Sequence, residues 1–327
     1  MNRRQFIQST LGTLGAMWVA GCGSEERVLT QPTITLGQID LSFHAAAAAV
    51  VARILTDHGH PVEFNTALHE EMFARMQRKE VDLLSSAWLP GSHGAYLAPF
   101  ENEVEKLSVL YNPYAFWGVP DYVPEDAVSA VADLLKPDVT ERMTKVIQGI
   151  GPGAGISRFS VEIMQAYGLG SAGYEFRNGT QQDCEDAFTR AVEEKRWVIV
   201  PLWHPQHLHH RYRIRELAEP KGLLRGKDEA TLILRKEQLS KIEPEALRML
   251  RRMHLGNAEV TYLDYLINVE KKSPPRPLLA GSRRTRKSSS DGGTAEHERR
   301  AGPAWPRLAL KRSRERPAWA PCGPAGT

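Results

Sequence analysis

Short apolar runs alternate with stretches of helical periodicity along the central part of the chain. A β-rich run at residues 33–36 is followed by Ala, Val, Ile and Leu at helical spacing over residues 43–55, and then by a second β-rich run at residues 62–64. A helical pattern over residues 69–78 leads to a third apolar run at residues 81–84. This succession predicts an α/β fold with a largely parallel sheet, in which ligands gather at the carboxyl ends of the strands.

The alternation restarts further along the chain, and no internal sequence repeat is evident. Chain crossings near residues 111–118 and 201–218 fit two lobes best, each a largely parallel sheet flanked by helices. We predict a first lobe from residues 33–115 with 218–270 and a second lobe from residues 116–217. The further predicted strands span residues 116–119, 145–147, 197–200 and 230–234, and the further predicted helices span residues 127–135, 160–167, 184–195, 244–254 and 260–269.

The first 21 residues have the pattern of a processed export signal. Arg3 and Arg4 precede a mildly apolar stretch that is too short and too polar to span a bilayer. The arginine pair resembles a twin-arginine signal, and the small residues before Cys22 resemble a site of cleavage and acylation. A general secretory signal with a chance cysteine is the alternative. We expect a lipoprotein anchored through Cys22 on the periplasmic side of the cell membrane, with residues 22–32 as a linker.

The charge of the chain is distributed unevenly. The overall formal charge is +3, yet residues 22–270 carry 26 Lys and Arg against 35 Asp and Glu. Such an acidic body is a poor binder of nucleic acid, because phosphate binding needs a concentrated positive surface. Residues 271–327 hold 14 basic and 4 acidic residues without apolar periodicity, which predicts a disordered tail. The alternative interpretation is a basic arm that binds acidic surfaces or nucleic acid. We expect the protein to be a monomer.

Two tryptophans follow predicted strands and have a proline close by. Trp88 lies in Ala-Trp-Leu-Pro, and Trp203 lies in Leu-Trp-His-Pro. Aromatic faces attract cations, and quaternary ammonium groups are a known ligand of such faces. Simple packing of each ring in the core is the alternative. Trp197 lies inside an apolar run and is expected in the core, whereas Trp117 lies at a predicted crossing between lobes.

Several motifs resemble those of the glycine betaine (OpuAC-type) substrate-binding proteins of bacterial ABC importers. Residues 82–96, DLLSSAWLPGSHGAY, resemble the first-lobe motif of that family. The resemblance implies a two-lobed, type II periplasmic binding protein that closes on a quaternary ammonium solute and delivers it to an ABC permease in osmoprotection. Further stretches in family order are GVPDYV at 118–123, GIGPGAG at 149–155, YGL at 167–169 and PLWHPQ at 201–206.

The resemblance implies an aromatic cage for the ligand. Trp88 and Trp203 are its carried-over walls, and Trp117 is a candidate third wall, for which Tyr111 and Tyr114 compete. Gln206 stands where many members have a histidine that helps to hold a carboxylate, and an amide can donate a hydrogen bond but no charge.

The loop after the first predicted strand is a second candidate for ligand contact. It contains Gly37, Gln38, Ile39 and Asp40, whose backbone N–H groups could meet a carboxylate at a helix start. Asp40 could instead balance a cation such as choline, or cap the following helix. Glycine betaine, choline, carnitine, proline betaine and amino-acid derivatives all remain open as ligands.

Histidines near the second tryptophan raise the alternative of a metal-binding receptor. His204, His207, His209 and His210 are close in sequence, but their spacing matches no closed structural zinc site. Cys184 lies among acidic residues that disfavour a thiolate. The common hydrolase, protease and nucleotide-binding motifs do not occur. We expect no metal, no cofactor and no catalysis.

Overall fold

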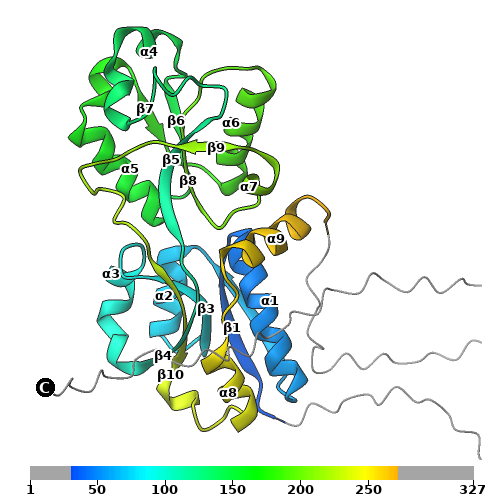
Figure 1. The fold of residues 1–327 in the computed structure, drawn as a ribbon. Helices are drawn as coiled ribbons and strands as arrows, with labels where there is room; N and C mark the ends of the chain where they lie inside the picture. The colour runs from blue at the N-terminus through cyan, green and yellow to red at the C-terminus, as the bar shows by residue number, and fades with distance from the viewer. Residues whose placement is uncertain (1–30, 272–327) are drawn as a thin grey trace, which may run out of the picture. The chain divides into compact units, whose positions relative to one another are not determined.

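The computed structural model describes residues 31–271, and within them the predicted α/β architecture is confirmed. The first lobe is built on a five-stranded sheet in the order β2-β1-β3-β10-β4 (Figure 1). Strand β1 runs parallel to β2 and β3, whereas β10 is antiparallel to β3 and β4. Its strands are β1 (Ile34–Ile39), β2 (Val62–Ala67), β3 (Leu83–Leu89), β4 (Val104–Tyr111) and β10 (Glu229–Arg235).

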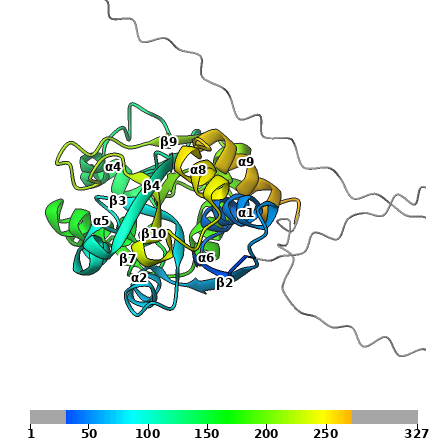
Figure 2. The ribbon, with the colours of Figure 1, turned by 90° about the horizontal axis from the view of Figure 1, so that it is seen from below.

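Helices cover both faces of this sheet, which explains its continuous apolar strands. All seven residues of β3 are buried, as expected for a strand covered on both faces. Helix α1 packs on β1 and β3 beside α8 and α9, and α2 lies on the other side (Figures 1 and 2). The helical segments are α1 (Ser42–Asp57), α2 (His69–Gln77), α3 (Gly94–Leu97), α8 (Pro244–Arg252) and α9 (Asn257–Asn268), with the 3₁₀ turns η1 (Ala98–Glu103) and η4 (Lys236–Gln238).

The second lobe differs from the largely parallel sheet that we predicted for it. Strand β5 pairs antiparallel with both β8 and β9, and only the short pair of β6 and β7 is parallel. The reason is that β5 leaves the first lobe while β8 runs back toward it (Figure 1). These strands are β5 (Tyr114–Pro120), β6 (Val146–Gln148), β7 (Glu175–Arg177), β8 (Val200–His204) and β9 (Ile214–Glu216).

The helices of the second lobe surround these two sheets. The helix predicted at residues 127–135 is wrong, because only a 3₁₀ turn forms at its end. The segments are η2 (Val131–Leu135), α4 (Pro137–Arg142), α5 (Gly155–Ala166), η3 (Leu169–Ala172), α6 (Gln181–Glu193) and α7 (Leu208–Arg211).

Two of the tryptophan positions are more regular than predicted. Trp88 and Trp203 lie inside β3 and β8, and not in loops after them. Each tryptophan pairs within its sheet with a residue far away in sequence: Trp88 pairs with Ala230, and Trp203 pairs with Ala115. The sheet backbone therefore holds both rings in place.

The export signal, most of the linker, Cys22 and the basic tail from residue 272 lie outside the described residues. Within residues 31–271, no helix combines the length and apolar character that crossing a membrane requires.

Candidate functional site

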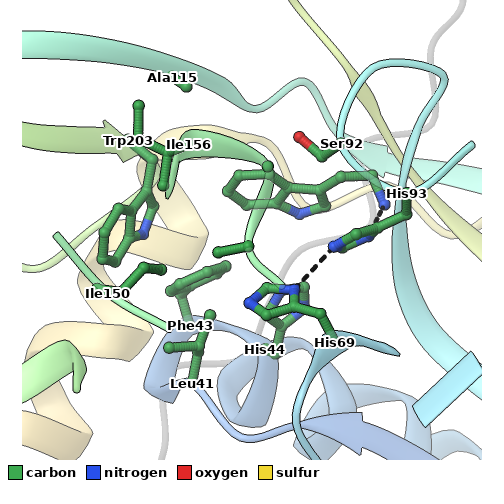
Figure 3. Close-up of a pocket in the computed structure, with 13 residues that line it drawn as sticks. Leu41, Phe43, His44, His69, Ser92, His93, Ala115, Ile150, Ile156 and Trp203 are labelled. Atoms are coloured by element: carbon green, nitrogen blue, oxygen red, sulfur yellow. Dashed lines mark hydrogen bonds between the residues drawn. The ribbon is translucent and has the colours of Figure 1, made fainter. Parts of the chain in front are cut away.

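A narrow pocket lies where elements of the two lobes meet (Figure 3). The first lobe supplies residues from the start of α1, from α2 and from β3 with the turn after it, and the second lobe supplies residues from β8 and from the segment that leads into α5. Ala115 belongs to β5, which crosses from one lobe to the other. The cavity has a volume of about 20 Å³, which is close to the space of a single water molecule. The lining residues are Leu41, Phe43, His44, His69, Trp88, Ser92, His93, Ala115, Ile150, Ala154, Gly155, Ile156 and Trp203.

Three aromatic rings form the centre of this pocket. The ring of Phe43 lies between the two tryptophans, with centroid distances of 5.2 Å to Trp88 and 5.6 Å to Trp203. Phe43 and Trp203 are each 1 % exposed, and Trp88 is 7 % exposed. The three rings pack on one another, so little free space is left between them. Phe43 was missed in the sequence analysis, although it follows the loop that was selected.

Trp88 is held at several atoms. Its indole Nε1–H donates to the hydroxyl oxygen of Tyr111 at 3.2 Å, and the two rings meet edge to face. Its backbone N–H donates to Nδ1 of His93 at 2.9 Å. The ring therefore has one orientation, with one face toward Phe43. Tyr111 is a support behind this wall and does not line the pocket.

Trp203 faces the pocket from the opposite lobe. Its backbone oxygen is 3.1 Å from Nε2 of His209. Its indole Nε1–H has no hydrogen-bond partner in the part of the chain that the structure describes. The structure thus brings together the two tryptophans selected from the sequence, one from each lobe.

Three buried histidines, His44, His69 and His93, line the first-lobe side of the pocket, and none of them was among the site residues predicted from the sequence. His93 Nε2 lies 2.9 Å from Nδ1 of His69, and Nδ1 of His44 lies 2.5 Å from the Ser86 hydroxyl. Burial lowers the pKa of all three imidazoles, and the pKa of His69 falls to about 4. These side chains are therefore neutral near pH 7 and act as hydrogen-bonding groups.

Trp117 lies away from the pocket. It is fully buried, and its indole Nε1–H donates to the Ser160 hydroxyl at 2.9 Å within the second lobe. Tyr114 is also absent from the lining and donates to Glu216 at 2.8 Å. The third ring at the pocket is that of Phe43.

None of the four residues predicted to contact the ligand near the first strand-to-helix connection lines the pocket. Gly37 and Ile39 are buried in the sheet, and a Cβ at Gly37 would lie 2.8 Å from Met72. Gln38 is partly exposed and Asp40 is exposed. The cap proposed for Asp40 is wrong, because α1 begins one residue later, with Leu41 at the N-cap and no side-chain cap.

Gln206 is buried in a separate polar cluster and does not line the pocket. Its amide nitrogen lies 3.4 Å from Glu185, and its carbonyl oxygen has no partner within residues 31–271. His207 lies 3.5 Å from both Glu185 and Asp264. Interaction with Asp264 and Glu185 outweighs burial and raises the pKa of His207, whereas burial raises the pKa of Glu185.

The four histidines that suggested a metal site have different partners. His204 stacks on His209 at a centroid distance of 3.6 Å, and His210 packs on Tyr265. Within residues 31–271 no group of three or more His, Cys, Asp and Glu side chains could hold a metal ion. Burial and the acidic neighbours Glu185 and Asp183 raise the pKa of Cys184, which excludes a ready thiolate.

Known structures share this fold. Lactococcal OpuAC in a closed form with glycine betaine matches with a TM-score of 0.65 at 21 % identity, over 74 % of this chain and 92 % of that one. The glycine betaine and L-proline-binding protein ProX of Borrelia burgdorferi matches with a TM-score of 0.65 at 20 % identity, over 73 % and 88 %. A choline-binding protein in complex with choline matches with a TM-score of 0.63 at 15 % identity, over 74 % and 85 %.

The family model for the substrate-binding domain of ABC-type glycine betaine transport systems, OpuAC, matches residues 32–277. This match covers most of the chain and includes both lobes. It agrees with the order of the motifs found along the sequence. The chain therefore belongs to the OpuAC family, the substrate-binding domains of ABC-type glycine betaine transport systems.

Proposed function

We propose that this protein captures a compact quaternary ammonium solute, glycine betaine in the first place, and delivers it to an ABC permease. The observation that carries the proposal is the meeting of Trp88 and Trp203, one from each lobe, across Phe43 in a single pocket. The family of the chain supports the same class of ligand.

The chemistry of a quaternary ammonium ligand fits a pocket lined by these aromatic rings. A trimethylammonium group has no N–H to donate and no lone pair, so its binding depends on apolar contact and on the quadrupoles of aromatic rings. Each ring contributes about 0.5 to 2 kcal/mol to such a contact. We assign Trp88, Phe43 and Trp203 to this role.

Contacts across the pocket support closure of the two lobes around the solute. Arg158 of α5 donates to the backbone oxygen of Ser92 and to the hydroxyl of Tyr96 at 2.6 Å. Gln181 of α6 donates to the hydroxyl of Ser42 at 2.7 Å. We take residues 33–115 with 218–270 and residues 116–217 as the two moving bodies, in line with hinge closure in binding proteins.

The amino-terminal sequence supports a place for this activity outside the cytoplasmic membrane. We propose that Cys22 is acylated and anchors a monomer on the periplasmic side. Cys22→Ser should release the protein from the membrane fraction, with the unchanged protein as the control. Full membrane retention of the variant would contradict the anchor without touching the binding function.

Calorimetry and tryptophan fluorescence test the binding function directly. Glycine betaine should bind with a heat signal and a shift in tryptophan emission, and chromatography should recover it chemically unchanged. A sugar and a neutral amino acid serve as control solutes. Absence of binding for every quaternary ammonium compound would refute the proposal.

A further inference from the structure

A buried carboxylate holds the turn that follows β3. Asp228 is 7 % exposed, and its two side-chain oxygens accept from successive backbone amides of this turn. The N–H of Gly91 donates to Oδ1 at 2.6 Å, and the N–H of Ser92 donates to Oδ2 at 3.0 Å. A buried carboxylate needs such donors, and hydrogen bonds to a charged acceptor are stronger than those between neutral groups. Asp228 therefore fixes the backbone of the turn at two points.

The same turn forms one side of the pocket. Ser92 and His93 line the cavity (Figure 3), and Trp88 lies at the end of β3, just before the turn. The N–H of His93 donates to the backbone oxygen of Trp88 at 2.8 Å, and Nδ1 of His93 accepts from the N–H of Trp88 at 2.9 Å. A displacement of the turn would therefore disturb the backbone contacts of a cage wall.

The second lobe contacts the first lobe at this turn. Arg158 of α5 donates to the backbone oxygen of Ser92. A Cβ at Gly155, the first residue of α5, would lie 2.6 Å from Oγ of Ser92. The absence of a side chain at Gly155 therefore permits a close approach of α5. The position of the Ser92 backbone decides whether this approach brings Arg158 to its acceptor.

Asp228 also lies where the chain crosses between the lobes. Residues 217–228 lead from β9 of the second lobe to β10 of the first, and the other crossing passes from β4 to β5 through Pro113. The two crossings meet at Asp228, whose N–H donates to the backbone oxygen of Pro113 at 2.7 Å. Tyr114 and Lys227 form a β-bridge beside this hydrogen bond. Because hinge closure of two lobes requires rotation at such crossings, Asp228 connects this rotation with the pocket turn.

We propose that Asp228 is a positioning residue of the ligand site. Its carboxylate sets the turn after β3, before the ligand arrives, so that the Ser92 carbonyl can accept from Arg158 when the lobes close. Asp228 is not among the lining residues and acts on ligand affinity without touching the ligand. The inference rests on the proposed function, because it takes closure on a quaternary ammonium solute as the event that the turn serves.

Asp228→Asn keeps the size of the side chain and removes one of its two acceptors. An amide nitrogen cannot accept a hydrogen bond, so one backbone N–H of the turn loses its partner. In the full-length protein, calorimetry should show a rise of about tenfold in the Kd for glycine betaine. The dissociation rate, followed by tryptophan fluorescence, should carry most of this rise, because the second lobe contacts the turn after closure.

Glu229→Gln is the matched control. Glu229 is the next acidic residue in the chain, and it is exposed where Asp228 is buried. This variant should leave the Kd for glycine betaine unchanged. Affinities are compared at a temperature and pH at which circular dichroism shows each variant to be folded.

A double-mutant cycle with Arg158→Gln separates positioning from general destabilisation. Both substitutions act on the Ser92 contact, so the loss of Arg158 should matter less when the turn is already misplaced. The rise in Kd of the double variant should be smaller than the product of the two single rises by about threefold or more. Rises that simply multiply would show that Asp228 supports the fold and does not position Ser92 for Arg158.

Hydrogen exchange in the wild-type protein tests the inference without a substitution. The amides of Gly91 and Ser92 should exchange slowly both before and after glycine betaine is added. The reason is that Asp228 and the turn belong to the same lobe, through the pairing of β10 with β3. This measurement holds even if Asp228→Asn fails to fold.

The outcomes separate this inference from the proposed function. An unchanged Kd in folded Asp228→Asn, an equal rise in Glu229→Gln, or rapid exchange of both turn amides in the unliganded protein would each overturn the inference. The function would survive in all three cases. Failure of the wild-type protein to bind any quaternary ammonium compound would overturn the function together with the inference.

Discussion

Removal of the second-lobe wall of the pocket should weaken ligand binding in a defined way. Trp203 is 1 % exposed, and its ring lies 5.6 Å from that of Phe43. Trp203→Ala removes one cage face, at a cost of about 1 to 2 kcal/mol or about tenfold in Kd for glycine betaine. Trp88→Ala should weaken binding by a similar factor. Trp88→Phe should weaken it less, because a smaller aromatic face remains.

Stability must be separated from affinity in this experiment. Replacing a buried Trp by Ala typically lowers the free energy of unfolding by about 3 to 5 kcal/mol. Trp88→Ala also leaves the Tyr111 hydroxyl without its indole donor. Circular dichroism and urea unfolding should therefore accompany calorimetry at one fixed pH. Affinity is then compared at conditions where each variant is folded.

Trp197 offers a matched control. It is also buried, but it lies outside the pocket, under the guanidinium of Arg142 at 3.9 Å. Trp197→Phe should leave the Kd for glycine betaine unchanged. Wild-type affinity in both Trp88→Ala and Trp203→Ala, with unchanged circular dichroism, would show that the ammonium site lies elsewhere.

Three further predictions concern stability, closure and the tail. Burial lowers the pKa of His69 from 6.5 to about 4, so the unfolded chain binds more protons between these values and stability falls as the pH falls through this window. Urea unfolding should show that His69 lowers the free energy of unfolding by up to about 3 kcal/mol as the pH falls through this window. The same pH-dependent loss in His69→Gln would contradict the attribution of this effect to His69. Arg158→Gln removes the contacts of Arg158 with Ser92 and Tyr96 between the lobes, so it should raise the Kd for glycine betaine about threefold to tenfold. Arg190→Gln on the surface is the control. An unchanged Kd in Arg158→Gln would argue against a role of these contacts in closure. Deletion of residues 273–327 should leave affinity and stability intact, and a several-fold loss of affinity in a folded variant would count against a dispensable tail.

The first five elements of the fold could be predicted from local pattern. Strands β1, β2 and β3 and helices α1 and α2 follow one another along the chain, so periodicity and strand propensity predict them. The strand β4 and the antiparallel arrangement of β5 with β8 were not predicted. Their pairing partners lie far away in sequence, and no local pattern specifies which strands will meet.

The candidate site could be predicted only where a motif marked it. Trp88 and Trp203 stand in motifs with characteristic neighbours, and the structure brings both to the pocket. Phe43 and His44 belong to an ordinary helical pattern, in which a residue facing a pocket looks the same as a residue facing the core. Trp117 is the opposite case. Its position at a predicted crossing between the lobes made it a candidate cage wall, but its indole hydrogen-bonds to Ser160 inside the second lobe.

The sequence by itself determined the class of the fold, the order of its first elements and the two tryptophans on which the proposed ammonium site rests. These properties depend on periodicity and on motifs within short segments. Only the tertiary structure decided that Phe43 lies between the two rings, that His93 and His69 form a buried pair, and that Nε2 of His44 has no hydrogen-bond partner within residues 31–271. These facts depend on which side chains from separate strands and helices become neighbours, because a hydrogen bond or a cage wall exists only when both partners are in place.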